Sequence, residues 1–230
     1  MQSRLAPSEL AGRIEKCFPA LTERGRRVSR ALHRMLALGW PVPEYAIAAT
    51  SRLQVVEVQE EMQGWTGVVR SETGRVTAFQ GLDLDSTPHR FEVEGRTLYA
   101  WCAWAALFLP GVIERAARVT SSCPVTGRRM ELLVGPETIR ERGASDVAVS
   151  MVDPERADVT GDQVVATFCR HIHFFASGEA AGEWARTRGD GIYILTLAAA
   201  FELGRRWNAH RFGDGPGLGG QVESPTPVDA

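Results

Sequence analysis

Residues 64–79 read GWTGVVRSETGRVTAF, and this stretch sets the predicted architecture of the first third of the chain. Two short runs of alternating apolar residues flank a Gly-containing turn, which is typical of a β-hairpin. The preceding pattern is helical from Ser8 to about Gln63, with two short helices joined by a tight turn in its last part. Helices followed by a hairpin predict a winged-helix-like region.

Beyond the hairpin, residues 81–96 form a polar, proline-containing connector with room for one strand, and we place a domain boundary inside it. The apolar run 98–113 predicts a buried helix that stops near Pro110. Strand-like segments follow at residues 117–135, 146–152 and 164–177, then a short helix at 178–188. The segment 191–212 begins as a strand or a helix and ends helical. The fold class is therefore α+β, with a helical domain at 1–85, a mixed or antiparallel sheet domain at 86–212, and a disordered tail at 213–230.

Composition is that of an ordinary globular protein, with 44% hydrophobic residues, 23% charged residues and a formal net charge of −2. The four cysteines are widely spaced and form no CxxC pair, which suits a reducing compartment. The N-terminus lacks a signal-peptide pattern, and the run 98–113 is shorter than the roughly 20 residues of a membrane span. We expect a cytoplasmic protein with no membrane partner.

The N-terminal region raises the question of DNA binding. Residues 1–40 carry eight Arg or Lys against three Glu, and basic patches are the usual footprint of phosphate binding. However, the expected recognition helix contains Glu57, Glu60 and Glu61, which would repel phosphates. We expect a structural winged helix and no nucleic-acid partner.

The stretch 167–175, TFCRHIHFF, carries the densest group of chemically active side chains. On a strand, Cys169, His171 and His173 would project from one face. Three interpretations follow: a metal site, a thiol nucleophile with a histidine base, or a buried strand whose polar groups meet backbone partners. Cys17, Cys102 and Cys123, taken singly, are most simply core residues, since free cysteine is usually buried.

Four blocks, taken together and in order, resemble the organomercurial (alkylmercury) lyase family: LYAWCA (98–103), ARVTSSCPVTG (117–127), DVAVSMVDP (146–154) and FCRHIHFFAS (168–177). The resemblance covers roughly residues 25–212 and includes the helical, winged-helix-like region. It implies protonolysis of a carbon–mercury bond without a cofactor, by two cysteine thiolates and one aspartate. The catalytic and mercury-binding cysteines then match Cys102 and Cys169, and a structural cysteine matches Cys123.

The implied chemistry agrees with general principles, because mercury is a soft ion that prefers thiolates over imidazole or carboxylate. A second thiolate on the metal makes the bound carbon basic enough to take a proton from a nearby acid. On this interpretation Cys169 and Cys102 are two thiolates that bind the mercury together, a two-thiolate clamp. His171 and His173 are mostly structural. Low-molecular-weight thiols would remove the product ion.

The sequence departs from the family pattern at the proton shuttle. The family aspartate lies three residues after the first catalytic cysteine, and that position is Ala105 here. In addition, Arg170 follows Cys169 where the family often has a second cysteine. Three interpretations stay open. The first is a lyase in which water, a thiol or a neighbouring acid replaces the aspartate, with Asp146, Asp153 and Glu155 as the candidate acids. The second is a diverged member that binds a soft metal or acts on another substrate in the same pocket. A metal-responsive regulator is a third.

Overall fold

A computed structural model describes residues 7–143, 146–160, 163–188 and 190–213. The expected tail at 213–230 lies outside the described residues except for Gly213. The N-terminal part contains α1 (Pro7–Cys17), α2 (Glu23–Leu36), α3 (Glu44–Ser51) and α4 (Val55–Gln63), followed by the hairpin of β1 (Val68–Arg70) and β2 (Val76–Phe79). The helices and hairpin predicted from sequence are confirmed.

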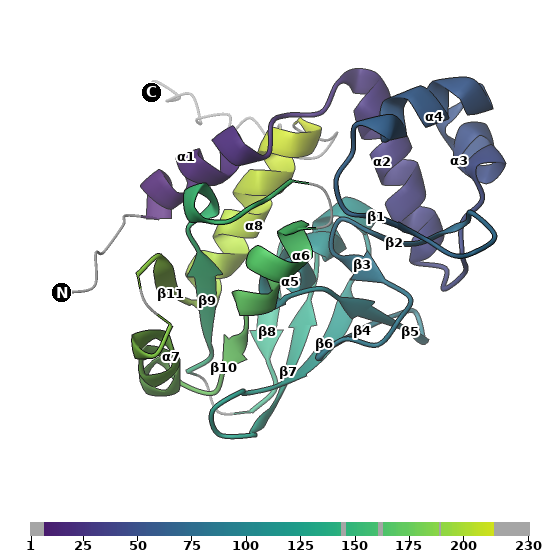
Figure 1. Cartoon of the computed structure of the whole chain (residues 1–230). Coiled ribbons are helices and arrows are strands. Elements are labelled where there is room, and N and C mark those ends of the chain that lie inside the picture. The colour runs from purple at the N-terminus through teal and green to yellow at the C-terminus, as the bar shows by residue number, and fades with distance from the viewer. Residues whose placement is uncertain (1–6, 144–145, 161–162, 189, 214–230) are drawn as a thin grey trace, which may run out of the picture.

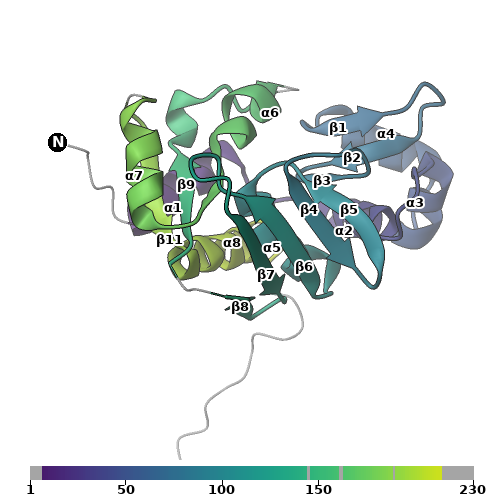
Figure 2. The same cartoon turned by 90° about the horizontal axis from the view of Figure 1, so that it is seen from below.

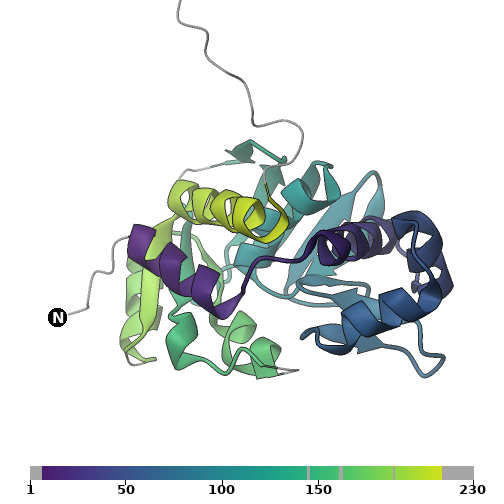
Figure 3. The ribbon, with the colours of Figure 1, turned by 90° about the horizontal axis from the view of Figure 1, so that it is seen from above.

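Short-range polar contacts set the limits of these helices. The Thr22 hydroxyl caps α2 by accepting a hydrogen bond from the N–H of Gly25 at 2.9 Å. Arg52 adopts φ 57° at the end of α3, which produces the tight turn into α4. Helices α2–α4 gather at one end of the molecule, away from α1 (Figure 3).

An antiparallel eight-stranded sheet forms the centre, with strand order β1-β2-β3-β5-β4-β6-β7-β8. Its further strands are β3 (Leu82–Asp83), β4 (His89–Val93), β5 (Arg96–Ala100), β6 (Ala117–Ser122), β7 (Arg129–Val134) and β8 (Ile139–Glu141). The connector predicted at 81–96 thus contributes strands to this sheet. The strands on either side of residue 85 share one sheet, and the division into two domains stays a prediction.

A second, three-stranded antiparallel sheet has the order β10-β9-β11, formed by β10 (Phe174–Phe175), β9 (Ala148–Val152) and β11 (Ile192–Thr196). Helix α7 (Gly178–Arg186) packs on it, and α8 (Leu197–Phe212) follows β11 directly. Figures 1 and 2 show this smaller sheet and α7 at the end of the molecule opposite to α2–α4.

Helix α5 (Ala103–Ile113) lies at the core, where it packs against α8, α2 and strands of both sheets. Its side chains are apolar all round and nearly all buried, as expected for a helix enclosed by other elements. The sequence predicted that this helix stops near Pro110, but it runs to Ile113. Pro110 lies inside the helix, where it cannot donate to the carbonyl four residues earlier, and the helix ends within one turn after it.

Candidate active site

Cys102 occupies the junction between β5 and α5. Its backbone is extended, with φ −153° and ψ 168°, and it is the N-cap of α5. The N–H of Ala105 donates a hydrogen bond to the Cys102 sulfur at 3.3 Å. The sulfur is buried and faces the positive end of the helix dipole, a setting that stabilises a thiolate.

Cys169 begins a short 3₁₀ turn, η2 (Cys169–His171), which follows α6 (Gln163–Thr167). The predicted strand over 164–177 is therefore wrong, apart from the two residues of β10. The backbone N–H of Ile172 bonds back to the carbonyl of Cys169 at 3.0 Å instead of joining a ladder. Ser150 of β9 fixes the turn, since its hydroxyl donates to the carbonyl of His171 at 2.8 Å and accepts from the N–H of His173 at 2.9 Å.

One main-chain hydrogen bond joins the two cysteine segments. The N–H of Ala103, next to Cys102, donates to the carbonyl of Ile172 at 3.1 Å. Cys102 and Cys169 line the same cavity, and each thiol shifts the pKa of the other. The structure thus brings together the two cysteines that the sequence analysis selected. His171 and His173 do not line the cavity at this pair, and His173 packs against Trp184 with ring centroids 5.2 Å apart.

The two thiols differ in acidity. Burial raises the pKa of Cys102, but hydrogen bonds from Cys169 and from the N–H groups of Ala105 and Trp104 outweigh it, so the pKa lies below its ordinary value. The hydrogen bond to Cys102 and burial hold the pKa of Cys169 well above its ordinary value. The first proton of the pair therefore leaves Cys102, and the second stays on Cys169.

A cavity of about 80 Å³ opens at the two cysteines. Its walls are mainly aromatic and come from α5, α6, α8 and the segments beside β1, β2, β5 and α1: Phe18, Thr66, Gly67, Gln80, Gly81, Trp101, Cys102, Trp104, Ala105, Phe108, Val164, Phe168, Cys169, Trp207 and Arg211. None of these described lining residues is a carboxylate.

Ala105, the position of the family aspartate, lines the cavity one helical turn after Cys102. Gly81 approaches it closely: with φ +107°, a Cβ placed on Gly81 would lie 2.9 Å from the Ala105 Cβ and 3.3 Å from the Phe108 ring. Only glycine combines this backbone conformation with this approach, so Gly81 shapes the wall opposite the N-terminus of α5.

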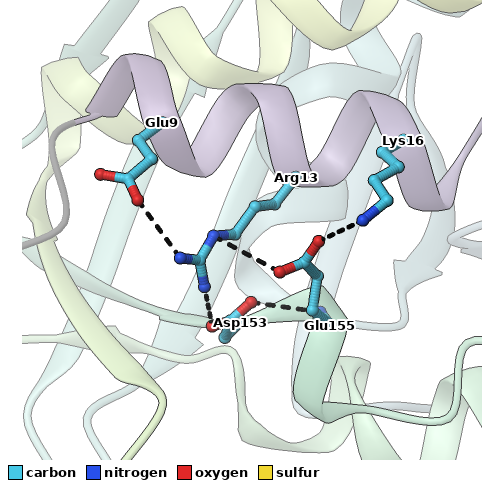
Figure 4. A network of polar contacts seen from close by, with 5 residues as sticks. All are labelled: Glu9, Arg13, Lys16, Asp153 and Glu155. Atoms are coloured by element: carbon cyan, nitrogen blue, oxygen red, sulfur yellow. Dashed lines mark hydrogen bonds and ion pairs between the residues drawn. The ribbon is translucent and has the colours of Figure 1, made fainter.

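The carboxylates considered from sequence lie elsewhere. Asp153 is 1% exposed and accepts from the Arg13 guanidinium, while Glu155 pairs with Lys16 at 2.8 Å (Figure 4). This network fastens α1 to the segment after β9, and Phe18, the residue following α1, lines the cavity. Asp146 does not line the cavity either.

The sequence analysis did not select Asp83, a half-buried carboxylate that is hydrogen-bonded to Trp101 in the cavity wall. Its Oδ2 accepts from the indole N–H of Trp101 at 2.8 Å, and burial raises its pKa. Trp101, half-buried beside Cys102, needs an acceptor for its N–H, and this was the available signal. No local pattern distinguishes Asp83 from the other acidic residues as that acceptor.

The other two cysteines stand apart from the cavity. Cys123 is buried in the turn between β6 and β7, where its carbonyl accepts from the N–H of Gly127 at 2.9 Å. Cys17, expected in the core, is half-exposed at the end of α1. All four thiols are free.

Within the described residues, no group of three or more His, Cys, Asp and Glu side chains is placed to hold a metal ion. Nor does any helix there combine the length and the apolar character of a membrane span. The site is thus a pair of buried thiols in an aromatic cavity. Two thiols that line one cavity define a class of protein able to bind a soft metal through two sulfurs.

Comparison with known proteins identifies the family within that class. Residues 82–209 match the model of the family described as MerB, alkylmercury lyase. An alkylmercury lyase of Staphylococcus epidermidis is 37% identical over 214 residues, covering 91% of this chain and 94% of the relative. One from Pseudomonas putida is 37% identical over 173 residues, 75% of this chain and 79% of the relative.

The fold agrees with the sequence match. A crystal structure titled the mercury-bound form of MerB2 superimposes with a TM-score of 0.70 at 22% identity, covering 88% of this chain and 98% of that one. The chain belongs to the alkylmercury lyase family. Its α+β fold, predicted from sequence, is confirmed.

Proposed function

We propose that this protein cleaves the carbon–mercury bond of organomercurials, with Cys102 and Cys169 as its catalytic, mercury-binding clamp. The observation that carries the proposal is a pair of buried thiols that line one cavity with aromatic walls, one of them at the N-terminus of α5. Thiolate sulfur is the protein ligand that a soft ion prefers. Organomercurials are the substrates that the names of the relatives indicate.

The first step uses the more acidic thiol. The Cys102 thiolate attacks the mercury of R–Hg–X, where X is a small thiolate or halide, and X leaves with its electron pair. The helix N-terminus stabilises this thiolate before the attack. The product of the step is R–Hg–S(Cys102), still holding the intact carbon–mercury bond.

The second step needs an acid, and the Ala105 methyl group supplies none. The Cys169 thiol keeps its proton, because its pKa is raised, and it faces the Cys102 sulfur where the mercury binds. We propose that Cys169 replaces the aspartate. Its sulfur bonds to mercury while its proton passes to carbon, the carbon–mercury electron pair forms the new C–H bond, and R–H leaves. Mercury stays divalent between two thiolates, so no oxidant or reductant is required.

The surrounding walls favour this proton path. The rings of Trp104 and Phe168 lie with centroids 6.4 Å apart beside the cysteines, and their apolar surface limits water at the reacting carbon. Low-molecular-weight thiols then exchange with the two cysteines and remove the ion. Because the cycle requires free thiols, we place it in a reducing, cytoplasmic compartment.

We propose that α2–α4 with the β1–β2 hairpin form a structural unit without nucleic-acid affinity. Glu61 pairs with Arg24 at 2.9 Å, so a basic residue of α2 is engaged by the acidic helix α4. The Arg27 guanidinium donates to the carbonyls of Ser51 and Arg52. These contacts use basic groups to join helices, and the carboxylates of α4 oppose phosphate.

The test is the product balance with phenylmercury and excess thiol. The purified protein should release benzene and inorganic mercury in equal amounts over many turnovers. The matched control is the Cys102→Ser, Cys169→Ser double variant, which should release neither. Stoichiometric binding of phenylmercury by the wild-type protein without benzene would refute lyase activity.

A further inference from the structure

Arg211, in the last turn of α8, lines the same cavity as Cys102 and Cys169. The residue is only 8% exposed. One terminal nitrogen of its guanidinium donates to the carbonyl of Pro19, and the other lies 3.4 Å from Oε1 of Gln80. Its Nε has no hydrogen-bond partner among the described residues.

Within the described residues, no carboxylate lies within ion-pair distance of Arg211, whereas many other cationic groups there form ion pairs, as Arg205 does with Glu202 on the same helix. Burial lowers its pKa to about 10, which still leaves the guanidinium charged at neutral pH. A buried charge without an opposite charge is costly. The hydrogen bond to Pro19 explains the position of the side chain, but a neutral carbonyl does not balance its charge.

The neighbouring walls suit a flat organic group. The Trp207 ring lies 5.7 Å from that of Trp104 and 4.4 Å from that of Phe108, centroid to centroid. The Arg211 guanidinium carbon lies 5.9 Å from the Trp207 centroid. One cavity therefore combines a soft-metal clamp, aromatic walls and a buried cation.

We propose that Arg211 is a specificity-determining residue that favours organomercurials whose organic group carries an anionic substituent such as a carboxylate. This inference rests on the proposed function of the cysteine pair and adds a substrate class to it. The thiolates hold mercury, and the anionic substituent supplies the opposite charge that the Arg211 guanidinium lacks. A hydrogen bond to a charged group discriminates against a neutral analogue by about 10- to 100-fold.

The experiment compares 4-mercuribenzoate with p-tolylmercury, which have similar size but differ in charge. Association is followed by quenching of tryptophan fluorescence, and cleavage by release of benzoic acid or toluene. The variants are Arg211→Gln, which removes the charge, and Arg211→Lys, which keeps it. Arg205→Gln is the matched control, since Arg205 lies on the same helix and pairs with Glu202 at the surface.

In the wild-type protein we expect 4-mercuribenzoate to associate about 10- to 100-fold more tightly than p-tolylmercury. Arg211→Gln should bring this ratio close to one, while Arg211→Lys and Arg205→Gln should retain most of it. A wild-type ratio near one, or a ratio that persists in folded Arg211→Gln, would overturn the proposal. Association is scored separately from cleavage, so a protein that binds with this preference but releases no product would count against lyase activity alone.

Discussion

Two buried cysteine environments in this protein differ in what surrounds the sulfur. Cys102 has a helix N-terminus, a second thiol and a cavity beside it. Cys123 is as deeply buried, but it lies in the turn after β6 with no second cysteine as its partner. Burial alone therefore does not distinguish a reactive thiol from a structural one. A reactive thiol is distinguished by its position at a helix N-terminus and by a second thiol from another segment of the chain.

The largest expected effect separates these two environments by substitution. Cys102→Ser or Cys169→Ser should lower kcat/KM for phenylmercury by on the order of 10⁴- to 10⁶-fold, as for removal of other nucleophiles. Cys123→Ser should cost about 1–3 kcal/mol of unfolding free energy and change kcat/KM by less than about tenfold. Benzene release and urea denaturation of each variant measure both quantities. Equal losses of activity in folded Cys123→Ser and Cys169→Ser would contradict the assignment of Cys169 as catalytic and Cys123 as structural.

The next effect concerns the proton donor. Ala105→Asp places a carboxylate one turn after Cys102, and a positioned acid contributes on the order of 10²- to 10⁴-fold to a rate. Carbon–mercury cleavage should rise, while mercury binding stays largely unchanged. Single-turnover release of benzene gives the rate, and Ala105→Asn is the matched control of similar shape without an acid. If a folded Ala105→Asp variant is no faster than Ala105→Asn, the cavity geometry differs from that of the family.

The comparison also shows what sequence patterns could predict. The hairpin and the β6–β7 pair were confirmed because their alternation and turns are local signals. The segment 164–177 has the same alternation, yet Ser150 of a distant strand and main-chain bonds within η2 fold it into a turn. Pairing of Cys102 with Cys169 came from the family resemblance. The charge of Arg211 in the cavity depends on long-range packing that no local pattern records.

A smaller effect concerns His89, which lies between the two cysteine regions. Its Nδ1 is 3.0 Å from the hydroxyl of Ser121, two residues before Cys123, and its ring lies 6.3 Å from that of His173, beyond Cys169. Burial and the His173 ring lower the pKa of His89 to about 3, so the folded protein keeps it neutral. The unfolded chain takes up a proton near its ordinary pKa.

Stability should therefore fall as pH drops below about 6.5, by about 1.4 kcal/mol per pH unit for this histidine. Urea denaturation at pH 7, 6 and 5 measures the slope. His89→Gln should reduce the slope by that amount whatever its effect at pH 7. An unchanged slope in the variant would mean that His89 is protonated in the folded state.

The location of a bound mercuric ion tests the central claim most directly. A crystal of the protein with one equivalent of mercuric chloride, examined by anomalous scattering, should show a single dominant ion bonded to the sulfurs of both Cys102 and Cys169. An ion bound at Cys17 or Cys123, with Cys102 and Cys169 empty, would contradict the two-thiolate clamp.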